Sequence, residues 1–246
     1  NAGASDQMLE EAKAKLQAGD FDDAQSLARE VLRRREGRFG PDTPKLAPVL
    51  TVLANIERGR GHFAAAEPLL RRALKIREKA LDPDQPLVGQ SLVKLAELLR
   101  DEGRYGEAAP LYQRADAILE KARGPDDPQV AQVLASWAFL LQLRGQTARA
   151  EPLFRRALAI RLAALGPEQP EVAKSLSQPA NLLRLQRRYD EAAPLFQQAL
   201  AVAEKALGPE HPLVAQILNS YANMLHSRGD NAAAEPLYRR CLAIRE

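Results

Sequence analysis

Apolar positions along the chain recur at spacings of three and four residues, the period of one face of an α-helix. Residues 86–123 show this most clearly. A first stripe consists of Val88, Leu92, Leu95, Ala96 and Leu99, and a second of Ala108, Leu111, Tyr112, Ala115 and Ile118. Gly103-Arg104-Tyr105 separates the two stripes, and Gly124-Pro125 ends the second, because proline cannot continue a helix. The segment therefore predicts two consecutive amphipathic helices. Asp126 or Asp127 can cap the helix that follows.

The pattern returns every 42 residues. Fifteen of the seventeen prolines fall into three columns with this spacing. They are Pro41, Pro83, Pro125, Pro167 and Pro209; Pro44, Pro86, Pro128, Pro170 and Pro212; and Pro68, Pro110, Pro152, Pro194 and Pro236. Alanine, leucine and glycine columns keep the same step, and Arg187 is the single exception in the glycine column. Such a period indicates stacked helical units, each of which needs its neighbours to bury its apolar face.

The first helix of a unit carries Leu-x-x-Leu/Trp/Tyr-Ala, followed by Gly-x-Tyr and Ala-x-x-x-Tyr/Phe-x-x-Ala-Leu. This arrangement resembles the tetratricopeptide repeat, and the 42-residue unit with its Gly-Pro-Asp/Glu-x-Pro link resembles the kinesin light chain type. The resemblance implies an all-α fold, a right-handed superhelical solenoid of about six helix-turn-helix repeats. It also implies that the first helices line a concave groove that binds extended peptides.

The period divides the chain into one solenoid over residues 5–246. The expected units are 5–40, 46–82, 88–124, 130–166, 172–208 and 214–246. Residues 1–4 are expected to be disordered or a tag remnant. The last unit stops within its second helix, so we expect the natural chain to continue.

Two columns of the first helices carry the candidate binding residues. The column after the recurring alanine holds Asn55, Asn181 and Asn223, with Phe139 in the fourth unit. Three residues further lie Arg58, Arg100, Arg184 and His226, on the same side of the helix. The next position holds Leu143 and Leu185, and Asn219 matches an asparagine that is common in kinesin light chain repeats.

These residue types suit an extended ligand. An asparagine amide both donates and accepts, so it can bind a peptide backbone, and arginine can take a carboxylate bidentately. Phe139, Leu143 and Leu185 predict an apolar pocket. The alternatives are that the arginines are merely solvated and that Phe139 packs against a neighbouring unit. Pro179, in mid-helix, is expected to kink its helix beside Asn181.

Composition and charge exclude several classes of protein. Basic and acidic residues are nearly balanced (35 against 32) and mixed along the chain, which argues against a nucleic-acid partner. No apolar run is long enough to span a membrane. The single cysteine and three isolated histidines show no metal-ligand spacing, and no catalytic motif or cofactor-binding loop is present. We therefore expect neither an enzyme nor a metal or cofactor site.

The sequence thus predicts a non-catalytic scaffold that binds a protein segment, acidic and with an apolar anchor, in its groove. A regulatory or sensor arm of a larger signalling protein is one alternative. Self-association through the uncapped last unit is another. A cytoplasmic location is expected.

Overall fold

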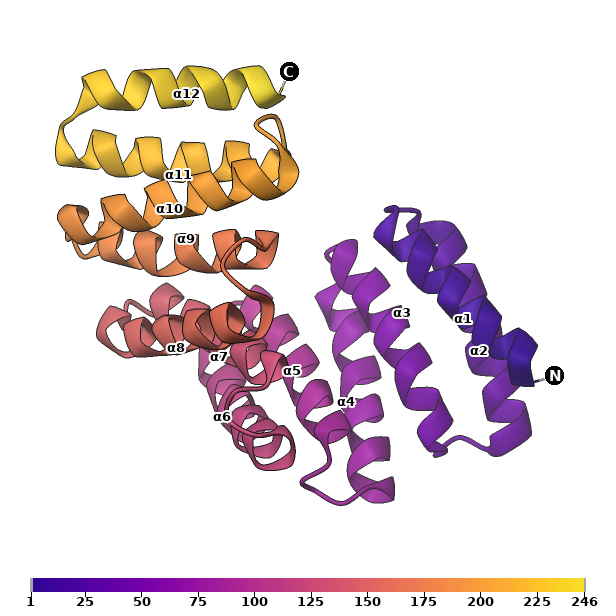
Figure 1. Cartoon of the computed structure of the whole chain (residues 1–246). Coiled ribbons are helices and arrows are strands. Elements are labelled where there is room, and N and C mark those ends of the chain that lie inside the picture. The colour runs from indigo at the N-terminus through magenta and orange to yellow at the C-terminus, as the bar shows by residue number, and fades with distance from the viewer. Residues whose placement is uncertain (1, 246) are drawn as a thin grey trace. The chain divides into compact units, whose positions relative to one another are not determined.

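The computed structural model describes residues 2–245 of the chain, which form twelve α-helices and one short 3-10 helix (Figure 1). The helices alternate between first and second members of each repeat. Their bounds are α1 Ala2–Gln17, α2 Phe21–Phe39, η1 Pro44–Leu46, α3 Ala47–Gly59, α4 Phe63–Ala80, α5 Pro86–Asp101, α6 Tyr105–Arg123, α7 Pro128–Leu143, α8 Thr147–Leu165, α9 Pro170–Leu185, α10 Tyr189–Leu207, α11 Pro212–Arg228 and α12 Asn231–Arg245. The predicted all-α repeat fold is confirmed.

The chain separates into two compact units, Asn1–Gly124 and Pro125–Glu246. In unit 1, α1 packs on α2, α3 on α4 and α5 on α6, and α2–α3 and α4–α5 contacts join the pairs. In unit 2, the pairs are α7–α8, α9–α10 and α11–α12, joined through α8–α9 and α10–α11. Each unit therefore consists of three stacked helix pairs.

Local signals in the sequence set the ends of these helices. Asp127 is the N-cap of α7, where its carboxylate accepts a hydrogen bond from the backbone N–H of Gln129 (2.8 Å). The turn inside each repeat needs a left-handed residue, which Gly103 provides with φ of 78°. Arg187 occupies the equivalent turn with φ of 59°, the one non-glycine residue with positive φ in the described chain. The exception in the glycine column is therefore a strained position.

One expectation from the sequence differs from the structure. Helix α1 begins at Ala2, so residues 2–4 are helical rather than disordered, while Asn1 lies outside the described residues. Helix α1 is stabilised because its Leu9 and Ala12 are buried in a core cluster with residues of α2 and α3. Helix α9 continues through Pro179, whose side chain is buried, and the kink expected there stays a prediction.

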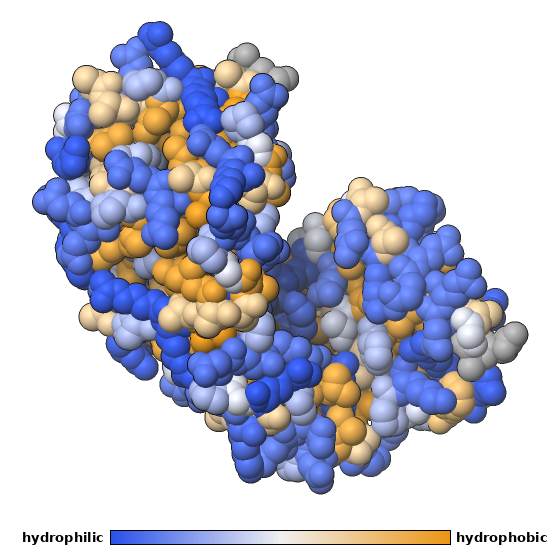
Figure 2. All heavy atoms as spheres, in the orientation of Figure 1, coloured by the Kyte–Doolittle hydropathy of each residue, from blue (hydrophilic) through white to orange (hydrophobic). Residues whose placement is uncertain are grey.

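The core of each unit combines small and large side chains in register. The alanines at positions 24, 66 and 108 of unit 1 and 150, 192 and 234 of unit 2 are buried and allow close approach of the paired helices. Tyr112, Phe154 and Phe196 share one column and are almost completely buried. Phe196 stacks on Tyr221 with ring centroids 5.6 Å apart. In Figure 2, hydrophilic residues cover much of the visible face of each unit, and apolar patches show between them.

Candidate peptide-binding surface

The first helices of unit 2 expose apolar side chains in the predicted binding columns. Phe139 and Leu143 of α7 are 40% and 44% exposed, and Leu185 of α9 is 49% exposed. These are among the few large apolar residues with high exposure. Because transfer of apolar surface from water is favourable, a ligand that covers these side chains gains binding free energy.

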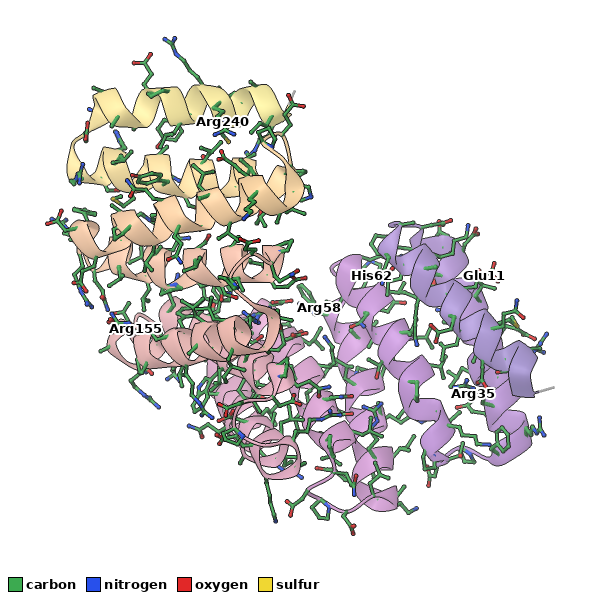
Figure 3. All side chains as sticks on the ribbon, viewed as in Figure 1. Glu11, Arg35, Arg58, His62, Arg155 and Arg240 are labelled. Atoms are coloured by element: carbon green, nitrogen blue, oxygen red, sulfur yellow. The ribbon has the colours of Figure 1, made fainter. Side chains whose placement is uncertain are left out.

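Unit 1 presents charged residues in the equivalent columns. The Arg58 guanidinium lies 2.6 Å from a carboxylate oxygen of Asp101 and 3.3 Å from one of Glu97. Arg100 also binds Asp101, at 2.8 Å, and Lys94 binds Glu97, at 3.0 Å. Figure 3 labels Arg58 near the end of α3. The two predicted cations of unit 1 are therefore compensated by carboxylates of their own chain.

Arg184 in unit 2 differs from Arg58 in this respect. Its side chain is half-buried, its Nε is buried without a hydrogen-bond partner, and within the described residues no carboxylate pairs with it. The repeat explains why. The two partners of Arg58 lie 39 and 43 residues further along the chain, and the same offsets from Arg184 reach Asn223 and Ser227, which are neutral.

The asparagines of unit 2 are half-buried and partly engaged. Asn181 donates from Nδ2 to the backbone carbonyl of Ser177 (3.0 Å), and Asn223 accepts through Oδ1 from the Tyr238 hydroxyl (2.6 Å). Asn181 therefore keeps its acceptor oxygen, whereas Asn223 keeps its amide donors. Asn219 is half-buried on the same helix as Asn223. His226 is exposed, with Nδ1 2.7 Å from Oδ1 of Asn231.

Asn55 lines a cavity of about 520 Å³ on the first helices of unit 1. Its polar neighbours there include Gln17, Thr51 and Lys94. The sequence placed Asn55 on a binding surface but gave no indication of Lys13, which also lines this cavity from α1. Lys13 was missed because α1 belongs to a degenerate repeat, in which few residues match the consensus and the register is hard to assign.

A second feature that sequence reasoning missed is a polar contact between neighbouring repeats. Arg77 of α4 donates to the Ser91 hydroxyl, and Arg161 of α8 donates to the Ser175 hydroxyl, both at 2.7 Å. Burial lowers the pKa of both guanidinium groups. A partial signal was available, because Leu119 and Ala203 in the arginine column are followed by Val133 and Ile217 in the serine column. The first repeat departs from it, since Arg35 is followed by Val49.

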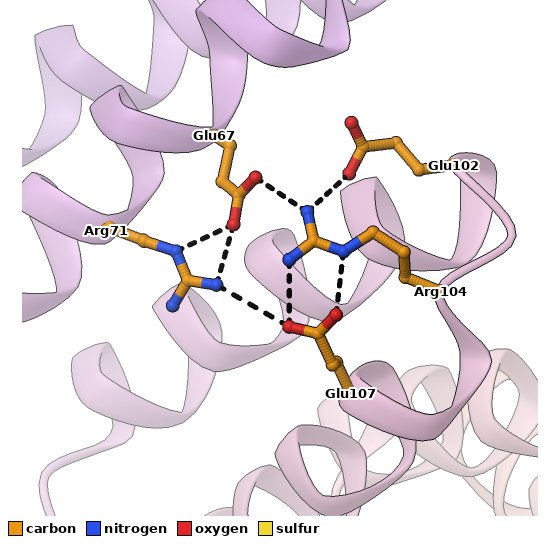
Figure 4. Close-up of polar contacts among 5 residues, drawn as sticks. All are labelled: Glu67, Arg71, Glu102, Arg104 and Glu107. Atoms are coloured by element: carbon orange, nitrogen blue, oxygen red, sulfur yellow. Dashed lines mark hydrogen bonds and ion pairs between the residues drawn. The ribbon is translucent and has the colours of Figure 1, made fainter.

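Ion-pair networks join the repeats away from these columns. Arg104 binds Glu67 (2.7 Å), Glu102 (3.0 Å) and Glu107 (2.8 Å), and Arg71 also reaches Glu67 (Figure 4). The hydrogen bond from Arg104 lowers the pKa of both Glu67 and Glu107. Unit 2 has the same arrangement 84 residues later, with Gln186 in place of Glu102. The residues that correspond to Glu67, Arg71, Glu102, Arg104 and Glu107 are Glu151, Arg155, Gln186, Arg188 and Glu191. Because the same network joins neighbouring repeats in both units, we infer that these charged side chains stabilise the stacking of repeats.

Searches for other site types give two findings. Among the described residues, no group of three or more His, Cys, Asp or Glu side chains is placed to hold a metal ion. In the described part of the chain, every helix is too short or too polar to cross a membrane.

Stacked helix pairs with exposed polar and apolar columns define a helical repeat scaffold, a class that generally binds other proteins. The tetratricopeptide repeat profile matches residues 7–79, 87–163, 133–193 and 171–246. The chain belongs to the tetratricopeptide repeat family. No curated protein matches it.

Solved structures show the same fold. BtubC (BKLC) from P. vanneervenii is 25% identical, with a TM-score of 0.75 over 90% of this chain and 88% of that one. The nearly identical TPR-like repeats of a candidate kinesin light chain from Podosopora anserina are also 25% identical, with a TM-score of 0.73 over 83% of this chain and 97% of that one. RapI in its apo form shares the fold at 13% identity, with a TM-score of 0.71 over 98% and 97% of the two chains. The predicted resemblance to the kinesin light chain type of repeat is thus confirmed.

Proposed function

We propose that this protein is a non-catalytic scaffold whose unit 2 binds an extended, acidic protein segment with an apolar anchor. The observation that carries the proposal is Arg184, a half-buried cation with no carboxylate partner among the described residues. A half-buried charge costs stability unless it is paired. A carboxylate of the ligand supplies the missing partner, in the role that Asp101 fills for Arg58 in unit 1.

The residues around Arg184 suit the rest of such a segment. Leu185 on α9 and the pair Phe139 and Leu143 on α7 offer exposed apolar surface for a bulky anchor side chain. Asn181 offers an acceptor and Asn223 offers donors, which together match the N–H and C=O groups of an extended backbone. Similarity to a candidate kinesin light chain supports a peptide-binding role.

The test is a binding screen by fluorescence anisotropy. Peptides with one tryptophan or leucine and flanking Asp or Glu are compared with peptides that carry Asn or Gln instead. Arg184→Gln is expected to weaken binding of the acidic peptides about tenfold, the effect of losing one charge-assisted hydrogen bond. Ser227→Asp places a carboxylate where Arg58 has its partner, and is expected to weaken binding by a similar factor.

Arg58→Gln is the matched control, because Arg58 occupies the same column but is paired within unit 1. It is expected to leave the affinity unchanged. Equal effects of Arg58→Gln and Arg184→Gln would contradict the proposal, as would a failure of every acidic peptide to bind.

Self-association is a second candidate, favoured by one observation. Leu242 on α12 is 61% exposed, whereas Leu74, in the same column, is 9% exposed. An exposed leucine of this kind can pack against a second copy of the chain. Light scattering over a hundredfold concentration range tests this: Leu242→Gln is expected to abolish any rise in mass, and a constant mass for the parent protein would contradict it.

A further inference from the structure

The first repeat contains a cavity of about 580 Å³. Its polar lining comes from Ser5 and Asp6 of α1, from Arg34, Arg35 and Arg38 of α2 and from Lys45 of η1. Phe39 and Pro48 add apolar wall. We name this site the first-repeat cavity. All of its lining residues belong to unit 1, and none belongs to the binding columns described above.

The charge of the first-repeat cavity is strongly positive. Four cationic side chains face one carboxylate across its lining. Arg35 is held by Asp6 (2.5 Å) and by the backbone carbonyl of Lys45 (2.7 Å), and Arg34 pairs with Glu30 outside the cavity (2.6 Å). Arg38 and Lys45 have no carboxylate partner among the described residues, and their charges lie 5.0 Å and 3.8 Å from the centre of the Phe39 ring. Two cations thus remain without a compensating anion.

One residue that lines this cavity carries a buried hydroxyl group. Ser5 is 8% exposed, and its Oγ is buried without a hydrogen-bond partner. Every other repeat has a small apolar residue or glycine at this position. The column is Ala47, Gly89, Ala131, Ala173 and Ala215. An unpaired buried hydroxyl costs stability, so alanine would fold better here, and the hydroxyl is explained by a ligand that it contacts.

Two of the cations also depart from the repeat. The column of Arg34 otherwise holds Ile76, Ile118, Ile160, Val202 and Ile244, and the column of Arg38 otherwise holds Ala80, Ala122, Ala164 and Ala206. An alternative explanation for Arg34 and Arg38 is that a terminal repeat carries polar residues simply to give the array a solvated outer surface. That explanation fits the exposed side chains of Arg34 and Arg38 but not Ser5, whose hydroxyl is buried.

We propose that the first-repeat cavity binds a phosphate monoester group. A phosphate dianion matches the two uncompensated cations, and its oxygens accept from guanidinium, ammonium and hydroxyl donors together. The phosphate can be carried by a phosphorylated protein segment or by a small molecule such as a nucleotide. The site stands apart from the proposed peptide-binding columns and does not depend on them.

Another cavity of unit 1, different from the one that Asn55 lines, provides a matched control. It has a volume of about 420 Å³ and is also lined by four cations and one carboxylate, Arg71, Arg72, Lys75, Lys79 and Asp42. Three of its cations are already paired, since Arg71 binds Glu67 (2.6 Å), Arg72 binds Glu36 (2.7 Å) and Lys79 binds Asp42 (3.3 Å). This cavity therefore has the same number of charged lining residues as the first-repeat cavity, but only Lys75 among its cations has no carboxylate partner in the described chain.

The experiment is calorimetric titration of the full chain with four probes. They are inorganic phosphate, adenosine 5′-monophosphate, a phosphoserine peptide and its unphosphorylated counterpart. The parent protein is expected to bind the phosphorylated probes and not the unphosphorylated peptide. Tighter binding of the peptide than of the nucleotide identifies a protein source of the phosphate, and the reverse order identifies a nucleotide source.

The variants locate the site. Arg38→Gln combined with Lys45→Gln is expected to weaken phosphate binding roughly ten- to a hundredfold, and Ser5→Ala about tenfold, without loss of helicity or thermal stability. Lys75→Gln combined with Lys79→Gln is expected to change affinity less than twofold. Arg184→Gln is expected to change nothing, which separates this site from the proposed function.

Failure of all three phosphorylated probes to bind would overturn the proposal. An equal loss of affinity in the Lys75→Gln, Lys79→Gln control would also overturn it, because binding would then follow total charge rather than the first-repeat cavity.

Discussion

In unit 1, Arg58 lies against Glu97 and Asp101, 39 and 43 residues further along the chain, whereas in unit 2 the same offsets from Arg184 reach the neutral residues Asn223 and Ser227. Both arginines are half-buried on the last turns of first helices. One is compensated by its own chain and the other is not. The comparison teaches that one helical framework can hold an arginine that is paired in one unit and unpaired in the other, through one substitution in each of two columns, Glu97 against Asn223 and Asp101 against Ser227.

The column that contains Asp101, Leu143 and Leu185 also differs between the two units. Where unit 1 has Asp101, unit 2 has Leu143 and Leu185, both largely exposed. The loss of a carboxylate and the gain of apolar surface occur together. Under the proposed function a ligand covers both features, because its carboxylate pairs with the cation and its apolar anchor packs on the leucines.

The largest expected effect on the free energy of unfolding comes from a substitution in the core of unit 2. Phe196→Ala removes a fully buried ring that stacks on Tyr221 and is expected to cost about 3–5 kcal/mol of unfolding free energy. Urea unfolding followed by circular dichroism measures it. The same column in unit 1 holds Tyr112, whose buried hydroxyl has no partner, so Tyr112→Phe is the control and is expected to cost nothing. A cost below about 1 kcal/mol for Phe196→Ala would contradict the packing described here.

A second prediction removes one of the two carboxylates that pair with Arg58 in unit 1, while Glu97 remains. Asp101→Ser removes the carboxylate that binds both Arg58 and Arg100 and is expected to cost about 1 kcal/mol, because the side chains are only partly exposed. Urea unfolding again provides the measurement. Ser227→Asp in unit 2 is expected to act in the opposite direction and raise stability by a few tenths of a kcal/mol. If both variants shift stability in the same direction, the proposed equivalence of the two columns is wrong.

A third prediction concerns the turn inside the repeat. Gly103 of unit 1 and Arg187 of unit 2 both have positive φ, which disfavours a side chain. Arg187→Gly is expected to raise stability by about 1 kcal/mol, and Gly103→Arg to lower it by a similar amount. Thermal unfolding of the two variants decides this, and a loss of stability on Arg187→Gly would show that the arginine side chain has a compensating role.

The smallest expected effect is the acid response of the ion-pair networks. Arg104 lowers the pKa of Glu67 and Glu107, and Arg188 lowers that of Glu191. A lowered pKa in the folded state gives stability that is present above the unfolded-state pKa and is lost as the pH falls through the folded-state value.

The matched variants are Arg104→Gln and Arg188→Gln, one in each unit. The difference in urea midpoint between each variant and the parent protein is expected to be largest near neutral pH and to shrink on acidification below the ordinary carboxyl range. A difference that does not change with pH would mean that the networks contribute nothing through charge.

Much of the fold was predictable from sequence, and particular residues show why. The 42-residue period locates every helix pair, and Gly124 and Asp127 mark a helix end and a helix cap from local chemistry alone. Helix α9 continues through Pro179, and the kink expected at this proline stays a prediction.

The candidate surface was only partly predictable. The exposure of Phe139, Leu143 and Leu185 follows from their columns, but the pairing of Arg58 with Asp101 does not. That pair joins residues 43 positions apart on neighbouring first helices, so it depends on how side chains meet between repeats. The first-repeat cavity was missed for a related reason: a degenerate repeat hides its departures from the consensus until the structure fixes the register.

The most direct test of the scaffold proposal is a double-mutant cycle between Arg184 and the ligand. An acidic peptide selected in the screen is titrated, with each Glu or Asp in turn changed to its amide, against the parent protein and Arg184→Gln. If Arg184 receives a ligand carboxylate, one peptide position will show a coupling of about 1 kcal/mol or more, roughly a fivefold excess over additivity. Additive effects at every acidic position would contradict the central claim.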